Sequence, residues 1–169
     1  MLRKVVSGGQ TGADRAGLDF ALEVGLENGG YVPKGRKAED GRIDDRYHLT
    51  EMTSASYPVR TQRNVEASDG TVILTLKPEL EGGSALTARC ARELSRPWLH
   101  LHRTGKPDGL DSVLETAVQL AAFLDSHGIG VLNVAGSRES KEPGIYHFTL
   151  AVLREYWQGR YARRPETAA

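Results

Sequence analysis

Short apolar runs alternate along the chain with longer segments in which apolar residues recur every three or four positions. The runs have the length and β-prone composition of strands and lie at 3–7, 31–32, 71–76, 97–102 and 129–134. The periodic segments predict helices at about 11–27, 58–68, 85–94, 110–127 and 143–157. Because strands alternate with helices, the pattern predicts an α/β fold: a Rossmann-like three-layer domain with a mostly parallel sheet of about five strands.

One domain accounts for almost the whole chain. We expect residues 1–157 to form a single ligand-binding domain, and residues 158–169 to form a polar, disordered tail. The last helix is apolar on more than one side, which is typical of a deeply packed helix or of one that covers a subunit contact. A homo-oligomer is our expectation.

A charge-dense stretch without periodicity interrupts the alternation at 33–57. Loops of this length in a compact domain are usually functional covers or disordered segments. We expect a cover over a ligand site, with disorder as the alternative.

The charge balance and the single cysteine exclude several classes of protein. With 22 basic and 22 acidic residues, the bulk charge indicates neither nucleic acid nor a membrane surface as a partner. Cys90 cannot form an internal disulfide, and the N-terminal apolar run is too short for a secretory signal. We therefore expect a cytoplasmic protein.

Glycine clusters follow three of the predicted strands, and the first is SGGQTGAD at 7–14. Backbone N–H groups at the N-terminus of a helix favour an anion such as phosphate, although this loop is neither G-x-G-x-x-G nor Walker A. The alternative is a tight turn that needs glycine only for its shape, and Thr11 and Asp14 have the spacing of a capping box. The candidate ligand residues here are Gly8, Gly9, Gln10, Thr11, Gly12 and Ala13.

Two later loops repeat this strand, loop and helix arrangement. Their candidates are Gly82, Gly83, Ser84 and Thr87 in one loop, and Gly136, Ser137 and Arg138 in the other. If the loops at Gly8 and Gly82 share one ligand, their strands are neighbours, which favours the flavodoxin-like order 2-1-3-4-5. A plain surface loop is the alternative for the last cluster.

Side chains outside the glycine loops add possible contacts. Arg60, Arg63 and Asn64 have the spacing of one helix face, where they could clamp a phosphate or a planar ring; the alternative is an exposed basic face. His100 and His102 share one face of a strand, but no third ligand is evident, so we expect no metal site.

Five stretches together carry a family resemblance: SGGQTGADRAGLDFAL, GYVPKGRKAEDG, RTQRNVEASDGTVIL, GGSALT and LNVAGSRESKEPGIY. Between Lys4 and Trp157 the chain resembles the molybdenum cofactor carrier family, which is related to the Rossmann-type lysine-decarboxylase-like (LOG-like) proteins. The matching stretches contain all the candidates above and add Arg36. Ser137 departs from the proline expected after the glycine of the last motif.

The resemblance implies a protein that binds molybdenum cofactor (molybdopterin), a pterin carrying a phosphate, and hands it on unchanged, for example to a molybdoenzyme. A nucleotide-binding sensor and a nucleoside-monophosphate phosphoribohydrolase are the alternatives. The hydrolases of the wider family carry a glutamate after a PGG-x-GT-x-x-E loop. This chain reads EGGSALTARCARE, and Glu93 comes too late in the helix to reach the loop. We therefore expect no catalytic residue and favour a carrier.

Overall fold

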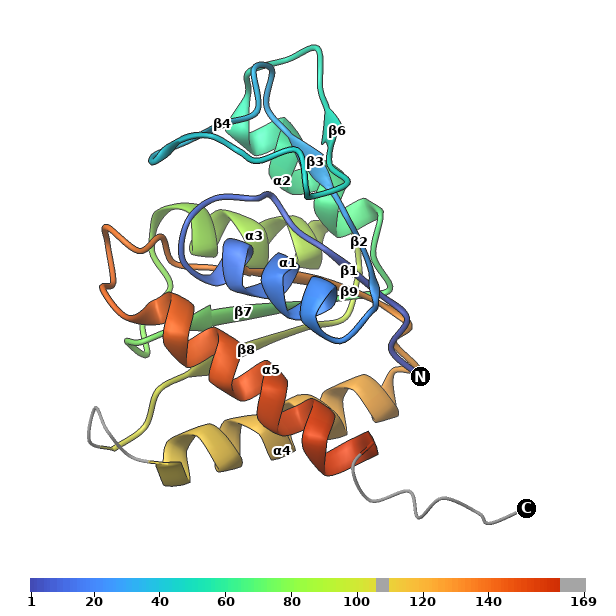
Figure 1. The fold of residues 1–169 in the computed structure, drawn as a ribbon, viewed down its shortest axis with the longest axis vertical. Helices are drawn as coiled ribbons and strands as arrows, with labels where there is room; N and C mark the ends of the chain where they lie inside the picture. Colours follow the sequence, from blue (N-terminus) through green and yellow to red (C-terminus); the bar gives the residue numbers. More distant parts are fainter. Residues whose placement is uncertain (106–109, 162–169) are drawn as a thin grey trace.

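The computed structural model describes residues 1–105 and 110–161, and a five-stranded parallel sheet lies at its centre (Figure 1). Its strands are β1 (Lys4–Val6), β2 (Glu27–Gly29), β7 (Gly70–Thr75), β8 (Trp98–His102) and β9 (Val131–Gly136). Every residue of β7 is buried, as expected for an inner strand that is covered on both faces. The predicted Rossmann-like α/β class is confirmed.

Five helices cover the two faces of the sheet. They are α1 (Ala13–Glu23), α2 (Tyr57–Glu66), α3 (Gly82–Glu93), α4 (Leu110–Ser126) and α5 (Ile145–Tyr161). On one face α5 packs between α1 and α4, whereas α2 packs on α3 on the other face (Figure 1). The apolar character of α5 on more than one side is explained by its two helix neighbours within the chain.

The strand order differs from the flavodoxin-like order that we expected. The sheet runs β2-β1-β9-β7-β8, so the last strand of the chain lies between the strands of the first two glycine loops. In chain order this is 2-1-5-3-4. If the strands are numbered with β9 first and the numbering then continues from β1, the order across the sheet becomes 3-2-1-4-5. The Rossmann order begins with the same five numbers. Such a permutation leaves each strand-helix unit unchanged, so no local sequence pattern reveals it.

The first helix ends earlier than predicted, and an additional strand follows it. α1 ends at Glu23, and Gly25 then adopts a left-handed φ of 73°. The chain enters the sheet as β2, which pairs with β1. The strand expected at 31–32 is β3 (Tyr31–Val32), which lies outside the central sheet and pairs with β6 (Thr50–Glu51).

The stretch at 33–57 is folded. It contains the antiparallel hairpin of β4 (Lys37–Ala38) and β5 (Gly41–Arg42). A small core attaches the stretch to α1; its members are Leu18, Val32, Ile43, Tyr47 and Leu49.

Arg36 holds this segment together from inside. Its guanidinium, in a residue only 7% exposed, donates to the carbonyl oxygens of Ile43 (3.1 Å), Asp44 (2.7 Å), Tyr47 (3.1 Å) and Leu49 (3.2 Å). Five N–H donors in one planar group can satisfy several carbonyls of an irregular segment at once. The structure therefore gives this candidate ligand residue a role in folding.

Two further boundaries differ from the predicted ones. α3 begins at Gly82, so the second glycine cluster is the first turn of that helix and not a loop before it. α5 continues to Tyr161, so residues 158–161 are helical, and the rest of the expected tail, 162–169, lies outside the described residues. Among the described helices, none combines the length and the apolar character needed to cross a bilayer.

We expect Arg36→Met to lower the free energy of unfolding by about 3 kcal/mol, because buried carbonyl groups lose charge-assisted hydrogen bonds. Urea unfolding measures the loss. Arg42→Met is the matched control: Arg42 pairs with Asp45 at 2.7 Å on the surface, and its side chain is 57% exposed, so its loss should change stability little. Equal losses in the two variants would contradict the role of Arg36.

Candidate functional site

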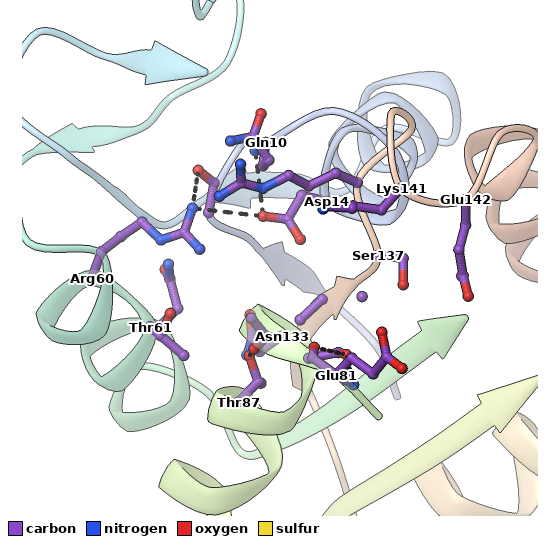
Figure 2. Close-up of a pocket in the computed structure, with 18 of the residues that line it drawn as sticks. Gln10, Asp14, Arg60, Thr61, Glu81, Thr87, Asn133, Ser137, Lys141 and Glu142 are labelled. Atoms are coloured by element: carbon purple, nitrogen blue, oxygen red, sulfur yellow. Dashed lines mark hydrogen bonds and ion pairs between the residues drawn. The ribbon is translucent and has the colours of Figure 1, made fainter. Parts of the chain in front are cut away.

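A cavity of about 600 Å³ opens at the carboxyl edge of the sheet, where β1, β9 and β7 end side by side (Figure 2). Its lining comes from the three loops after these strands, from α2 and from the first turn of α3. Ligands of open parallel sheets bind at this edge, where the strand order reverses. The volume lies within the usual range of small-molecule sites.

The loop after β9 is wedged between the loops on either side, and two glycines make room for it. Ala13 N donates to Ser137 O at 3.2 Å, and Ser137 N donates to Leu74 O at 3.1 Å. A Cβ on Gly12, which has a φ of 77°, would lie 2.4 Å from Ser137 O, and one on Gly136 would lie 2.0 Å from Leu74 O. Close backbone approach therefore requires glycine at both positions.

The Asp14 carboxylate lies at the N-terminus of α1, where the sequence predicts a phosphate. Asp14 is 6% exposed; its Oδ2 accepts the N–H of Gln10 at 3.3 Å and lies 3.9 Å from Nη1 of Arg60. Burial raises the pKa of Asp14, and the opposing attraction of Arg60 does not offset this effect, since no hydrogen bond joins the two groups. The first glycine loop thus already holds a carboxylate of the protein.

Arg60 reaches from α2 across the first glycine loop. Its Nη1 donates to Gly8 O at 3.3 Å, and a Cβ on Gly8 would lie 2.5 Å from that nitrogen. The guanidiniums of Arg60 and Arg138 lie 5.4 Å and 5.6 Å from the centre of the Tyr57 ring, within cation–π range. Two arginines from different elements therefore meet at one side of the cavity.

The first turn of α3 forms the opposite wall (Figure 2). Its hydroxyl groups bond within the helix: Ser84 Oγ donates to Glu81 O at 2.7 Å, and Thr87 Oγ1 donates to Gly83 O at 2.9 Å. A Cβ on Gly83 would meet nothing within 4 Å. Ser84 N and Ala85 N already donate to Glu81 O, so this wall offers a ligand the backbone at Gly82 and Gly83 and the positive end of the helix dipole.

Glu142 fixes the third side of the cavity. Its carboxylate accepts the backbone N–H of Leu76 at 2.7 Å and of Lys77 at 3.2 Å, which joins the loop after β9 to the loop after β7. The side chains of Lys77 and Lys141 belong to the same lining. The lining thus contains two lysines besides the two arginines, together with the carboxylates of Glu79 and Glu81.

The cavity brings many of the sequence-predicted residues together: Gly8, Gln10, Arg60, Asn64, Gly82, Gly83, Ser84, Thr87, Gly136, Ser137 and Arg138. The remaining candidates lie outside its lining, namely Gly9, Thr11, Gly12, Ala13, Arg36 and Arg63. Asn64 is at the cavity, but its amide bonds the backbone N–H and C=O of Tyr31. Arg63 has a side chain 60% exposed and pairs with Glu66.

Sequence reasoning did not assign several lining residues to the site: Asp14, Thr61, Lys77, Glu79, Glu81, Asn133, Ala135, Lys141 and Glu142. Asn133 had a recognisable signal, because a buried polar residue within an apolar strand needs a partner; its Nδ2 donates to Thr71 Oγ1 at 3.2 Å. Glu142 had none, since its partners are 66 and 65 residues away.

The hairpin of β4 and β5 fastens to the rim of the site. Glu39 N donates to Gln10 Oε1 at 2.9 Å, and Arg15 pairs with Asp40 at 3.2 Å. Glu39 also accepts hydrogen bonds from Ser140 in the loop after β9. No described residue of 33–57 lines the cavity. The stretch that we expected to cover the site therefore lies beside it and contacts its rim.

The comparisons with known proteins agree with this architecture. A family model described as "Circularly permutated YpsA SLOG family" matches residues 5–157. The chain belongs to this family. A permuted chain explains why the strand order becomes 3-2-1-4-5 only when it is read from β9.

The chain is also similar to a solved structure. The crystal structure of "Putative molybdenum carrier protein" from Syntrophus aciditrophicus SB has 44% sequence identity and a TM-score of 0.84, covering 92% of this chain and 94% of that chain. No curated protein matches the chain. The family resemblance inferred from the five sequence stretches is confirmed.

Asp14 should make stability depend on pH. A raised pKa means that the folded state binds the proton more tightly, so the stability that Asp14 contributes is present below its unfolded pKa of about 4 and is lost as the pH rises through the folded value. Asp14→Asn removes this titration. We therefore expect the Tm of the variant to rise relative to wild type as the pH increases above about 4. A Tm difference that does not vary with pH would contradict the burial of a charged Asp14.

Proposed function

We propose that this protein is a carrier that binds a phosphate-bearing small molecule in the cavity and releases it unchanged, with molybdopterin as the leading candidate. The single observation that carries the proposal is the open first turn of α3, which faces a cavity lined by Arg60, Lys77, Arg138 and Lys141. Helix N-termini and cationic side chains bind phosphate groups. The name of the similar crystal structure supports the choice of cargo.

The lining suits the organic part of such a cargo better than its metal. Among the described residues that surround the cavity there is no cysteine or histidine, the usual soft and imidazole ligands of transition metals. Polar side chains such as Asp14, Asn133 and Ser137 stand there instead. The protein would then hold molybdopterin by its phosphate and its ring.

A phosphoribohydrolase is the second candidate, and one observation favours it. A buried carboxyl with a raised pKa in a ligand-sized cavity is the type of group that serves as a general acid. Asp14 thus partly compensates for the glutamate missing from the second glycine motif. Release of free base from nucleoside monophosphates would promote the hydrolase, and recovery of intact nucleotide would favour the carrier.

Gly83→Val tests the α3 wall. The new side chain would enter open space, so the fold should be retained, while its two methyl groups would cover the first turn of the helix. We expect the affinity for ribose 5-phosphate, measured by calorimetry, to fall at least about tenfold. Gly159→Val is the matched control, because Gly159 is also helical with nothing within 4 Å and lies outside the cavity. Unchanged affinity in folded Gly83→Val protein would refute the wall as a phosphate site.

The arginines are expected to contribute through charge. Arg138→Ala and Arg60→Ala should each weaken the binding of a nucleoside monophosphate such as GMP roughly ten- to a hundredfold, since a charge-assisted hydrogen bond is worth about 1.5 to 3 kcal/mol. Their affinities should also depend less steeply on ionic strength than that of wild type.

Arg63→Ala serves as the control for this charge effect. Arg63 is on the same helix as Arg60 but outside the cavity, so its removal should change neither affinity nor salt dependence. If all three alanine variants behaved like wild type, the anion would be held by the backbone of α3 without help from the arginines.

A further inference from the structure

One oxygen of the buried Asp14 carboxylate is free for a ligand. Among the residues that the structure describes, a hydrogen bond reaches only Oδ2, from Gln10 N. Figure 2 shows the carboxylate directed into the cavity, beside Arg60 and above the wall that carries Thr87. A buried carboxylate whose second oxygen faces a cavity is an acceptor that needs a donor, because burial without partners disfavours the charge.

We propose that Asp14 and Arg60 together recognise a 2-amino-4-oxopyrimidine edge, the chemical edge that guanine and pterin rings share. The inference rests on the proposed function, in which the phosphate of the ligand binds at the first turn of α3. It adds the class of ring that binds at the other end of the cavity. Asp14 binds the donors of the edge, and Arg60 binds its carbonyl oxygen.

The pattern of donors and acceptors carries this assignment. The edge presents an amino group, a ring N–H and a carbonyl oxygen in sequence. A carboxylate has about four acceptor positions, and Gln10 N occupies one of them on Oδ2, so Asp14 can still accept two hydrogen bonds side by side; a guanidinium beside it donates to the next oxygen. Asp14 Oδ2 and Arg60 Nη1 are 3.9 Å apart, so the acceptor and the donor are adjacent on one wall.

The same pair disfavours an adenine edge. Adenine presents a ring nitrogen acceptor where guanine has N–H, and this acceptor would face the carboxylate. Leaving a buried charged acceptor unpaired is expensive, and sites built for a hydrogen bond strongly reject analogues that lack the donor.

Calorimetric titration of the full chain with GMP, IMP and AMP tests the proposal, because IMP lacks the amino group and AMP lacks both that group and the ring N–H. We expect affinity to fall in the order GMP, IMP, AMP, with GMP bound about a hundredfold more tightly than AMP. A 6-substituted pterin monophosphate forms a second arm. Binding of both compounds supports the shared edge whichever is bound more tightly. The compound with the higher affinity identifies whether the natural ring is a pterin or a guanine.

Two variants test whether the preference for GMP over AMP depends on Asp14 itself or on the loss of any negative charge. Asp14→Asn should reduce the preference for GMP over AMP to less than about tenfold while leaving pyrophosphate binding intact. Asp40→Asn is the matched control and should keep the full preference, since Asp40 pairs with Arg15 outside the cavity.

Two results would overturn the inference in distinguishable ways. Equal binding of GMP, IMP and AMP by wild-type protein, with pyrophosphate still bound, would remove the ring assignment and leave the proposed function. Absence of binding of every phosphate probe, pyrophosphate included, would remove both. If Asp14→Asn does not fold, the wild-type series of three nucleotides alone decides the matter.

Discussion

The backbone at Gly136 and Ser137 lies so close to its neighbours on both sides that no side chain fits at Gly136 or at the facing Gly12, and the rest of the site depends on this contact. It joins β7 to the N-terminus of α1 through two backbone hydrogen bonds. A third close approach has the same character: a Cβ on Gly30, which has a φ of 127°, would lie 2.1 Å from Ser7 O. Such glycines hold loops together that are distant in sequence, so the cavity they surround is a product of the backbone.

Many elements followed from the sequence because their signals are local. The periodic apolar residues of α4 place that helix within one residue of its predicted end, and the inner strand β7 was predicted to within one residue at each end. The glycine clusters identified the carboxyl edge of the sheet, where Gly8, Gly83 and Gly136 do line one cavity. Strand propensity, helix periodicity and turn composition are properties of short segments. They do not depend on the order in which the segments are connected along the chain.

The remaining features depend on contacts that no segment encodes by itself. The insertion of β9 between β1 and β7 is a matter of topology. Arg36 lies in one of the stretches on which the family resemblance was based, yet its guanidinium binds four carbonyls of an irregular segment whose path the sequence does not reveal. Asp14 shows the same limit, because its capping spacing was apparent while its burial under Arg60 depends on the position of α2. A charged residue in a motif can therefore serve the fold as readily as the ligand.

The balance of charge around the cavity bears on the proposed carrier function. Four cationic side chains, Arg60, Lys77, Arg138 and Lys141, face four carboxylates, Asp14, Glu79, Glu81 and Glu142. Glu142 accepts two backbone N–H groups and Asp14 accepts one, so both carboxylates are held at the cavity and lower its positive potential when they are charged. A purely cationic pocket would hold a phosphate dianion tightly and release it slowly, since differences in affinity appear chiefly in the dissociation rate. The carboxylates of the lining weaken phosphate binding, which would favour release of the ligand under the proposed carrier function.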